Sequence, residues 1–330
     1  MTRLPDSMVP APLAASPWYV AAYWALVVHA VSQAISAVAF ATFLVEPYPA
    51  WLSRPEYLGL LNFGLKFGGQ ITVVLGAVAG YAFAVRVLGV RAATLAFVVT
   101  FVLSLLAELS GTHFGVPFGV YGYSDRLGYK ILDLVPFNIP ASWFYMIVGC
   151  LAICARLLPA KDDATSRWWW ALVSGACLTA WDVLLDPAMV KTYHWIWRVP
   201  DLSGAPAWQR FIGEPIVYGM PITNWLGWLL TGTVVSRAAL AVVPPSAWAA
   251  ALRPWRFPLV LYGVNGLLPL AICLRQDMAW AGLAGGAVMG LPLWFAWRAV
   301  PFAPPGEPVS LPAPAHRAVP TLGGMAPAGD

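Results

Sequence analysis

The stretch Thr179-Ala180-Trp181-Asp182-Val183-Leu184-Leu185-Asp186-Pro187 closes a long apolar run with two carboxylates. Asp182 and Asp186 are four residues apart, so on a helix they share one face, one turn apart. The run that leads to them, 168–185, is otherwise almost free of charge and long enough to cross a bilayer. Ionisable groups inside such a span are costly and usually functional. We therefore expect a membrane helix here that carries part of a functional site.

The whole chain has the composition of a membrane protein. Of its 330 residues, 60% are hydrophobic and 10% are charged, and the mean hydropathy is +0.70. A bilayer crossing needs about 20 apolar residues, and by this measure the candidate spans are 18–45, 66–85, 91–109, 138–158, 168–186, 220–243, 255–274 and 278–299. The sequence thus predicts an all-α, polytopic transmembrane helical bundle of about eight spans, or seven if one pair is re-entrant.

The two ends of the chain differ from the bundle. Residues 1–17 are rich in Pro and Ala and lack the pattern of a signal peptide, and residues 301–330 form a run of Pro, Ala and Gly without periodicity. We expect both to be disordered, which leaves 18–300 as a single transmembrane domain. The loops on the side of the termini carry more of the 19 Lys and Arg residues. The positive-inside rule then predicts a multi-pass protein of the cell membrane with both termini in the cytoplasm.

Several classes of site receive no support from the sequence. It has no basic patch for nucleic acid, no histidine cluster for a metal, no dinucleotide fingerprint and no Walker motif. We therefore predict no metal and no cofactor. His29, Ser32, Gln33 and Ser36 form a polar stripe at helical spacing, which we interpret as a packing seam. The spacings Gly76/Gly80 and Gly286/Gly290 are likewise expected to mark helix packing.

Two further carboxylates, Glu108 and Glu214, flank other apolar runs. With eight spans, these ends lie on the same side of the membrane as Asp182 and Asp186, so a shared pocket is geometrically feasible. Two carboxyls close together in low dielectric cannot both ionise easily, so one is expected to keep its proton at neutral pH. A protonated acid beside an ionised partner is the arrangement that a general acid needs.

Each of these polar residues also has a structural interpretation. Asp186, before Pro187, is compatible with a helix that ends at the interface. Glu214 fits an acid at a helix N-terminus equally well. Asn224, inside the sixth span, either holds a water, orients a carboxylate or joins two helices.

A glycine-rich segment follows Glu108 and is predicted to form a compact loop over 110–137. Irregular backbone at membrane depth is tolerated where it is buried in protein or lines a cavity. We therefore expect the loop to line a pocket, the alternative being a capping turn in which glycines allow tight bends. His113 lies in this segment, and a structural role is favoured over a proton relay. Trp143, Trp181 and Trp225 border the acids, and aromatic faces stabilise cations by roughly 0.5–2 kcal/mol.

The same residues resemble a known family, the CruF-type carotenoid 1′,2′-hydratases. The resemblance covers about 105–230 and rests on these stretches, in order: Glu108-Leu109, Gly115-Val116-Pro117-Phe118-Gly119-Val120-Tyr121-Gly122-Tyr123, Leu127-Gly128, Trp181-Asp182, Asp186-Pro187, Trp195-Ile196-Trp197, Tyr218-Gly219-Met220-Pro221, Asn224-Trp225 and Gly227-Trp228.

The resemblance implies a membrane enzyme that adds water to the terminal C1′=C2′ double bond of an acyclic carotenoid end, as in lycopene or γ-carotene, without a metal or nucleotide. Its expected partners are the carotenoid, the lipid bilayer and other enzymes of the carotenoid pathway. Our candidate catalytic residues are Asp182 and Asp186, which supply the proton, and Glu108, which positions the water. The candidate substrate-binding residues are Trp181, Tyr121, Tyr123, Phe118, Trp143, Asn224, Trp225, Tyr218, His113 and Glu214.

Two other functions fit parts of the sequence. In a UbiA-like prenyltransferase, Asp182 and Asp186 would hold Mg²⁺ for a diphosphate, but that chemistry usually needs a second Asp-rich motif and several basic residues. In a carotenoid-binding or transport protein without enzymatic activity, the carboxylates would relay protons. Transporters often show internal repeats, and none is evident in this sequence.

Overall fold

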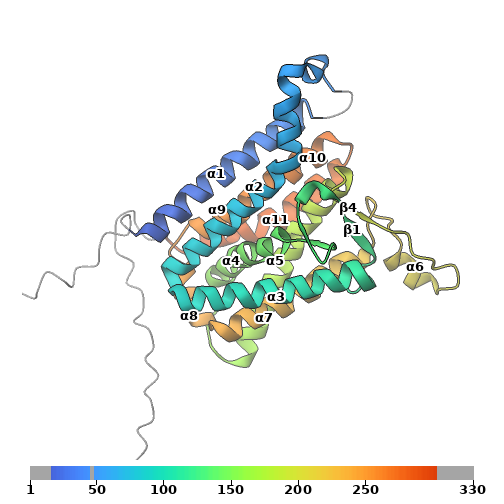
Figure 1. The fold of residues 1–330 in the computed structure, drawn as a ribbon. Coiled ribbons are helices and arrows are strands. Elements are labelled where there is room, and N and C mark those ends of the chain that lie inside the picture. Colours follow the sequence, from blue (N-terminus) through green and yellow to red (C-terminus); the bar gives the residue numbers. More distant parts are fainter. Residues whose placement is uncertain (1–15, 45–47, 303–330) are drawn as a thin grey trace, which may run out of the picture.

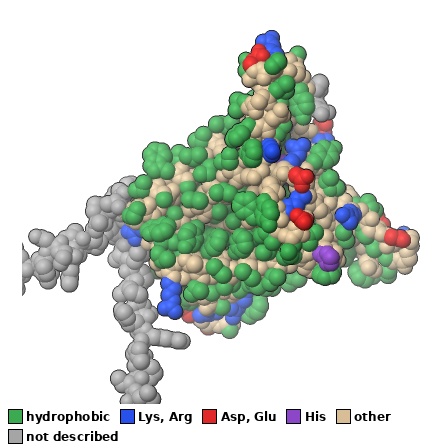
Figure 2. Space-filling model, viewed as in Figure 1, with side chains coloured by type: hydrophobic (Ala, Val, Ile, Leu, Met, Phe, Trp, Pro, Cys, Tyr) green, Lys and Arg blue, Asp and Glu red, His purple; other side chains and the backbone are tan. Residues whose placement is uncertain are grey.

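The computed structural model of the chain describes residues 16–44 and 48–302. They form a helical bundle in which eight helical segments are long and apolar enough to cross a membrane (Figure 1). The prediction of an all-α polytopic bundle is confirmed. Hydrophobic side chains cover the face of the bundle seen in Figure 2, and charged side chains gather toward its ends, as a bilayer requires. The lead and tail expected to be disordered fall almost entirely outside the described residues.

The bounds of the elements are as follows. The spanning helices are α1 (Pro17–Thr42), α2 (Pro55–Leu88), α3 (Val90–Phe114), α4 (Asn138–Leu157), α5 (Ala164–Lys191), α7 (Ile222–Val242), the pair α9 (Phe257–Val264) and α10 (Leu267–Arg275), and α11 (Ala279–Ala299). The short elements are η3 (Ala50–Ser53), η4 (Asp125–Leu127), α6 (Ala207–Gly213), α8 (Pro245–Leu252), β1 (Tyr121–Tyr123), β2 (Lys130–Ile131), β3 (Val135–Pro136) and β4 (Trp195–Trp197).

Three helix boundaries differ from the predicted spans. Helix α2 begins at Pro55 instead of 66, since proline is favoured in a first helical turn and the following glycines do not stop the helix. Helix α3 continues past Glu108 and ends at Gly115, whose φ of 77° is left-handed. Helix α5 continues through Pro187 to Lys191. Glu108, Asp182 and Asp186, which were expected at helix ends, therefore lie one or more turns inside their helices.

Helix α4 is the centre of the bundle. In its apolar window 89% of residues are buried, because α2, α3, α5, α8, α9 and α11 all pack around it. At the end of the bundle near Leu157, Arg156 donates hydrogen bonds to the carbonyl oxygens of Ala296, Arg253 and Val300. These bonds satisfy carbonyls that close the ends of α8 and α11.

Close helix packing depends on particular glycines. A Cβ atom at Gly80 would lie 2.6 Å from Tyr145 Cβ on α4, so the prediction that Gly76/Gly80 marks packing is confirmed. The Gly286/Gly290 prediction is wrong, because a Cβ at Gly290 meets nothing within 4 Å. On α11 it is Gly285 that makes the close approach, where a Cβ would lie 2.7 Å from Leu184 Cα.

Substituting these glycines tests the packing. Gly80→Ala is expected to destabilise the protein by about 1–3 kcal/mol, because the added methyl group forces α2 and α4 apart. The control Gly290→Ala enters open space and is expected to be neutral or slightly stabilising, since alanine favours helix by about 1 kcal/mol over glycine. Denaturant unfolding in detergent micelles, followed by circular dichroism, measures both. Equal stability of the two variants contradicts the close approach at Gly80.

Candidate active site

The acidic residues meet at one end of the bundle because successive spans run in opposite directions. Glu108 lies near the end of α3, and Asp182 and Asp186 lie near the end of α5. Asn224 is in the first turn of α7, and Trp143 is in the second turn of α4. The C-terminal ends of α3 and α5 and the N-terminal ends of α4 and α7 therefore surround one shared volume.

A two-stranded ribbon covers this volume. Strands β1 and β4 pair antiparallel, with Tyr121 opposite Trp197 and Tyr123 opposite Trp195. Because side chains alternate along a strand, these four aromatic residues share one face. That face is turned inward: Tyr121 and both tryptophans are buried, whereas Ile196 on the other face is 51% exposed. The ribbon therefore places a layer of aromatic rings over the acidic residues.

Glu108 is 2% exposed and is held by neutral donors. Its Oε2 accepts hydrogen bonds from the hydroxyls of Tyr121 and Tyr123, the latter at 2.8 Å, and its Oε1 accepts one from Trp143 Nε1 at 3.1 Å. Burial and the charge of Glu108 raise the pKa of both tyrosine hydroxyls well above their usual value, so both stay protonated donors. Each carboxylate oxygen has two lone pairs, so Oε1 keeps one acceptor position free.

Asp182 and Asp186 are joined by one amide. Asn224 Nδ2 donates to Asp182 Oδ2 at 3.1 Å and also to Asp186 Oδ2. The two carboxyls are 0% and 1% exposed, and Asp182 Oδ1 has no partner. Among the described residues, no Lys or Arg forms an ion pair with Asp182, Asp186 or Glu108. Two buried acidic groups thus share a single neutral donor.

A cavity of about 30 Å³ lies between Glu108 and Asp186. This volume is sufficient for a water molecule, which needs roughly 10–15 Å³ measured in this way. Trp143 and Trp228 stack in its wall with ring centroids 4.5 Å apart, and Trp181 meets Trp228 edge-on. The full lining is Glu108, Phe118, Tyr121, Tyr123, Ile139, Ser142, Trp143, Trp181, Leu185, Asp186, Trp195, Trp197, Asn224 and Trp228. We call this space the acid cavity.

The structure brings most of the candidate residues together. Eight of them line the acid cavity: Glu108, Asp186, Phe118, Tyr121, Tyr123, Trp143, Trp181 and Asn224. Asp182 lies behind them and is connected through Asn224. The glycine-rich segment lines the cavity as expected, through Phe118, Tyr121 and Tyr123. It also packs closely against α7, where a Cβ atom at Gly227 would lie only 2.8 Å from the carbonyl oxygen of Pro117.

Four candidates lie outside the acid cavity and are corrected here. His113 belongs to α3 instead of the loop, and its position, five residues from Glu108, puts it on the exposed side of the helix. Trp225 follows Asn224 directly on α7 and does not line the acid cavity. Tyr218 is 40% exposed, and Glu214 follows the short surface helix α6.

The list of candidate site residues omitted several lining residues, although Trp195, Trp197 and Trp228 stand in the stretches that carry the family resemblance. Trp195 and Trp197 stand in a motif with the two-residue spacing of a strand face, and Trp228 lies four residues after Asn224, on the same helix face. Those spacings were available as signals. Ile139, Ser142 and Leu185 carry no comparable signal.

Comparison with known proteins identifies the family. The family model described as "Carotenoid biosynthesis protein" matches residues 68–292, which includes every residue of the acid cavity. The chain belongs to this family, the family of the CruF-type carotenoid hydratases. Bisanhydrobacterioruberin hydratase of Haloarcula japonica is 31% identical over 144 residues, which is 44% of this chain and 43% of that relative. The chain thus matches less than half of the relative's length. No solved structure matches.

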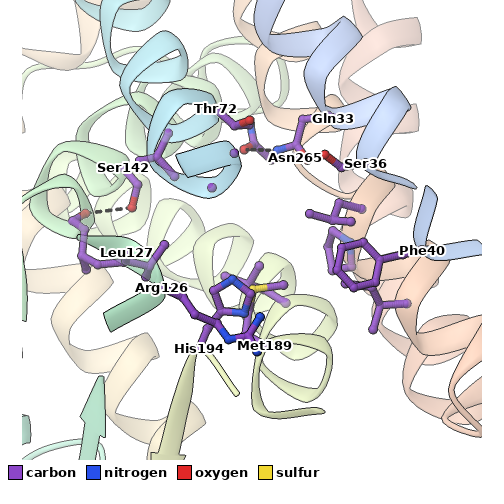
Figure 3. A pocket seen from close by; sticks show the side chains of 18 of the residues that line it. Gln33, Ser36, Phe40, Thr72, Arg126, Leu127, Ser142, Met189, His194 and Asn265 are labelled. Carbon is purple, nitrogen blue, oxygen red and sulfur yellow. Dashed lines mark hydrogen bonds between the residues drawn. The ribbon is translucent and has the colours of Figure 1, made fainter. Parts of the chain in front are cut away.

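A second cavity, of about 150 Å³, adjoins the acid cavity. Ile139, Ser142, Trp181, Leu185 and Trp195 line both. From there the second cavity extends between α1, α2 and α10. Figure 3 shows Gln33, Thr72 and Asn265 on one side of it and Arg126, Met189 and His194 on another. Most of its remaining lining is apolar.

The part of the chain that the structure describes holds no group of three or more His, Cys, Asp or Glu side chains placed to bind a metal ion. The lining of the acid cavity also includes no Lys or Arg that would bind a phosphate.

His194, at the edge of the second cavity, is a pH-sensitive group outside the spans. Its Nδ1 lies 2.8 Å from Thr192 Oγ1. Burial, assisted by the positive charge of Arg126, lowers the pKa of His194 to about 4. Its contribution to stability is therefore complete above the unfolded pKa of about 6.5 and is lost as the pH falls through that value toward about 4.

This shift predicts a measurable pH dependence of stability. His194→Gln keeps a hydrogen-bonding group near Thr192 but cannot take up a proton, so the variant is expected to lose less stability than the wild type between pH ~6.5 and ~4. The apparent melting temperature in detergent across this range measures the difference. The control His113→Gln, on an exposed site, should follow the wild type. Identical pH profiles for His194→Gln and wild type contradict the burial of a neutral imidazole.

Proposed function

We propose that this protein is a carotenoid 1,2-hydratase of the cell membrane, which adds water across the terminal C1′=C2′ double bond of an acyclic carotenoid end. The supporting observation is the acid cavity itself: a water-sized space between two separate acidic centres, enclosed by aromatic rings and adjoining a larger apolar cavity. The name of the relative from Haloarcula japonica, a hydratase, supports the same reaction class. The reaction is assigned to the chain's own residues, without a cofactor.

The chemistry explains why these groups are needed. Protonation of the trisubstituted alkene at C2′ leaves a tertiary cation at C1′, and water then adds at C1′ to give a tertiary alcohol. The π bond is broken, a C–H bond forms at C2′ and a C–O bond forms at C1′. The enzyme has to provide an acid, a stabilising environment for the cation, one placed water and an acceptor for its second proton.

Asp186 is the proton donor in this scheme. It lines the acid cavity, whereas Asp182 lies behind it, and Asn224 connects the two carboxyls. Without a cation nearby, the pair holds one proton, because two adjacent buried carboxylates repel each other. Asp182 is the ionised partner, and the proton that the pair holds is delivered to the cavity by Asp186, the member of the pair that lines it. This assigns the donor more closely than the sequence did.

The aromatic walls stabilise the cation. Trp228 contacts both Trp143 and Trp181, and all three line the acid cavity. A desolvated aromatic face contributes roughly 0.5–2 kcal/mol to a nearby cation. The negative charge of Glu108 lies behind Tyr121, Tyr123 and Trp143, which hold it in place.

Glu108 positions the water and takes its proton. The free acceptor position on Oε1 binds the water that attacks C1′. After the C–O bond forms, the proton passes to Glu108, and transfer of one proton through cavity water to the aspartate pair restores the starting state. We also propose that both termini are cytoplasmic, as the distribution of Lys and Arg predicts, which puts the acid cavity near the opposite face of the membrane.

A product assay tests the function. Expression in a lycopene-producing host is expected to yield a carotenoid heavier by one water, with oxygen from labelled water at C1′ and deuterium from heavy water at C2′. Absence of any hydrated product, or oxygen derived from O₂, refutes the proposal. A purely binding or transport role predicts unmodified lycopene, and a prenyltransferase predicts a prenylated product.

Substitution of the acids tests their roles. Asp186→Asn is expected to lower turnover by about 10²–10⁴-fold, because general acid catalysis contributes this much, while bound carotenoid is retained. Asp182→Asn should also lower turnover, since it removes the ionised partner. The control Asp201→Asn changes an exposed turn residue, whose Oδ1 accepts a hydrogen bond from Ser203 N, and should leave turnover unchanged. Near wild-type hydration by Asp186→Asn would remove it from the mechanism.

The aromatic wall makes a separate prediction. Trp228→Leu is expected to lower kcat about 2- to 30-fold, corresponding to a lost cation–π contribution of about 0.5–2 kcal/mol. Trp228→Phe keeps an aromatic face and should lose less. Trp280→Leu, at a residue that is 79% exposed, is the control. Equal rates for Trp228→Leu and Trp228→Phe contradict a role for the π face.

A further inference from the structure

The second cavity has no role in the proton chemistry, and its position points to the rest of the substrate. The acid cavity, at about 30 Å³, has room for water and the tip of a chain. The adjoining cavity, at about 150 Å³, offers the next available volume. Ser142 and Leu185 line both cavities and therefore lie at the boundary between them. A chain whose acyclic end lies at Asp186 has the second cavity as the nearest space for the rest of its length.

The α2 side of this cavity is open because it is built from glycine. Gly64 and Gly68 lie one turn apart on one helix face and both line the cavity. A Cβ at either position would meet nothing within 4 Å. Gly64 is exposed, and Leu65 beside it is 37% exposed. The cavity therefore reaches the surface of the bundle along α2, opposite Phe40 of α1.

The polar groups of the wall are largely occupied by each other. Gln33 Nε2 donates to Asn265 Oδ1 at 3.3 Å, and Tyr145 donates to the same oxygen. His29 and Ser32 bond to Thr72. Gln33 is 7% exposed, and its Oε1 has no partner. A buried carbonyl oxygen in this position suits a ligand with many weak C–H donors, as a polyene has.

We propose that the second cavity binds the extended isoprenoid chain, which enters from the bilayer over Gly64 and Gly68 and delivers its acyclic end past Ser142 and Leu185 to Asp186. The assignment rests on the proposed function. The polar stripe on α1 that the sequence suggested as a packing seam is part of this binding wall, through Gln33 and Ser36.

This route defines the class of substrate. Because the chain leaves the protein toward lipid over Gly64, the far end lies outside the cavity and is not recognised. The site therefore accepts long isoprenoid hydrocarbons that have at least one acyclic end. The far end is either acyclic, as in lycopene, or carries a ring, as in γ-carotene.

Blocking the groove tests the route independently of catalysis. In an Asp186→Asn background purified from lycopene-producing cells, the amount of bound carotenoid per protein is measured from its visible absorption. Adding Gly68→Phe fills the cavity and is expected to lower bound carotenoid by about tenfold, equivalent to about 1.4 kcal/mol. Gly59→Phe is the matched control, since it is exposed on the same helix and a Cβ there also meets nothing within 4 Å.

The outcomes separate the two proposals. Gly64→Phe blocks the same route at a second position and should also lower the amount of bound carotenoid. Gly68→Ala adds only a methyl group and should leave the amount of bound carotenoid unchanged. Unchanged carotenoid in both phenylalanine variants, or equal loss in Gly59→Phe, overturns the chain route. Failure of the proposed function appears elsewhere, as wild-type protein that binds carotenoid but forms no hydrated product.

Discussion

Three buried carboxyls that no Lys or Arg of residues 16–44 and 48–302 pairs with are the constraint on which the rest of this structure depends. Glu108, Asp182 and Asp186 are each at most 2% exposed, and their partners are a tryptophan, two tyrosines and one asparagine. A buried charge is strongly unfavourable unless it is hydrogen-bonded. The neutral donors lower this penalty without cancelling the charge, which leaves a site able to hold protons and to stabilise a positive intermediate.

The surrounding architecture serves to place those donors. The β1–β4 ribbon brings both tyrosines onto Glu108, and the contact of Pro117 with Gly227 fixes the loop against α7, one turn from Asn224. The same ribbon shields the cavity from water. In the proposed function, a hydrocarbon substrate reaches the acids through the largely apolar cavity beside α2.

Sequence reasoning predicted the parts that depend on local spacing. Eight apolar runs predicted the bundle, and the four-residue spacing of Asp182 and Asp186 predicted that they share one helix face; that Asn224 of α7 joins them is a tertiary contact. It could not predict that α5 continues through Pro187, since a proline inside a helix is tolerated only when tertiary packing compensates for it. Pairing between Tyr121 and Trp197, 76 residues apart, and the cavity lined by Gly68 also depend on long-range contacts that no local pattern encodes.

The central claim is that one proton is shared by Asp182 and Asp186 while Glu108 is ionised. Infrared difference spectroscopy of the protein in lipid at neutral pH tests this directly, because a protonated carboxyl and a carboxylate have distinct C=O stretching bands. The account predicts that the protonated-carboxyl band disappears in Asp186→Asn and persists in Glu108→Gln. A band that persists in Asp186→Asn and disappears in Glu108→Gln would contradict it.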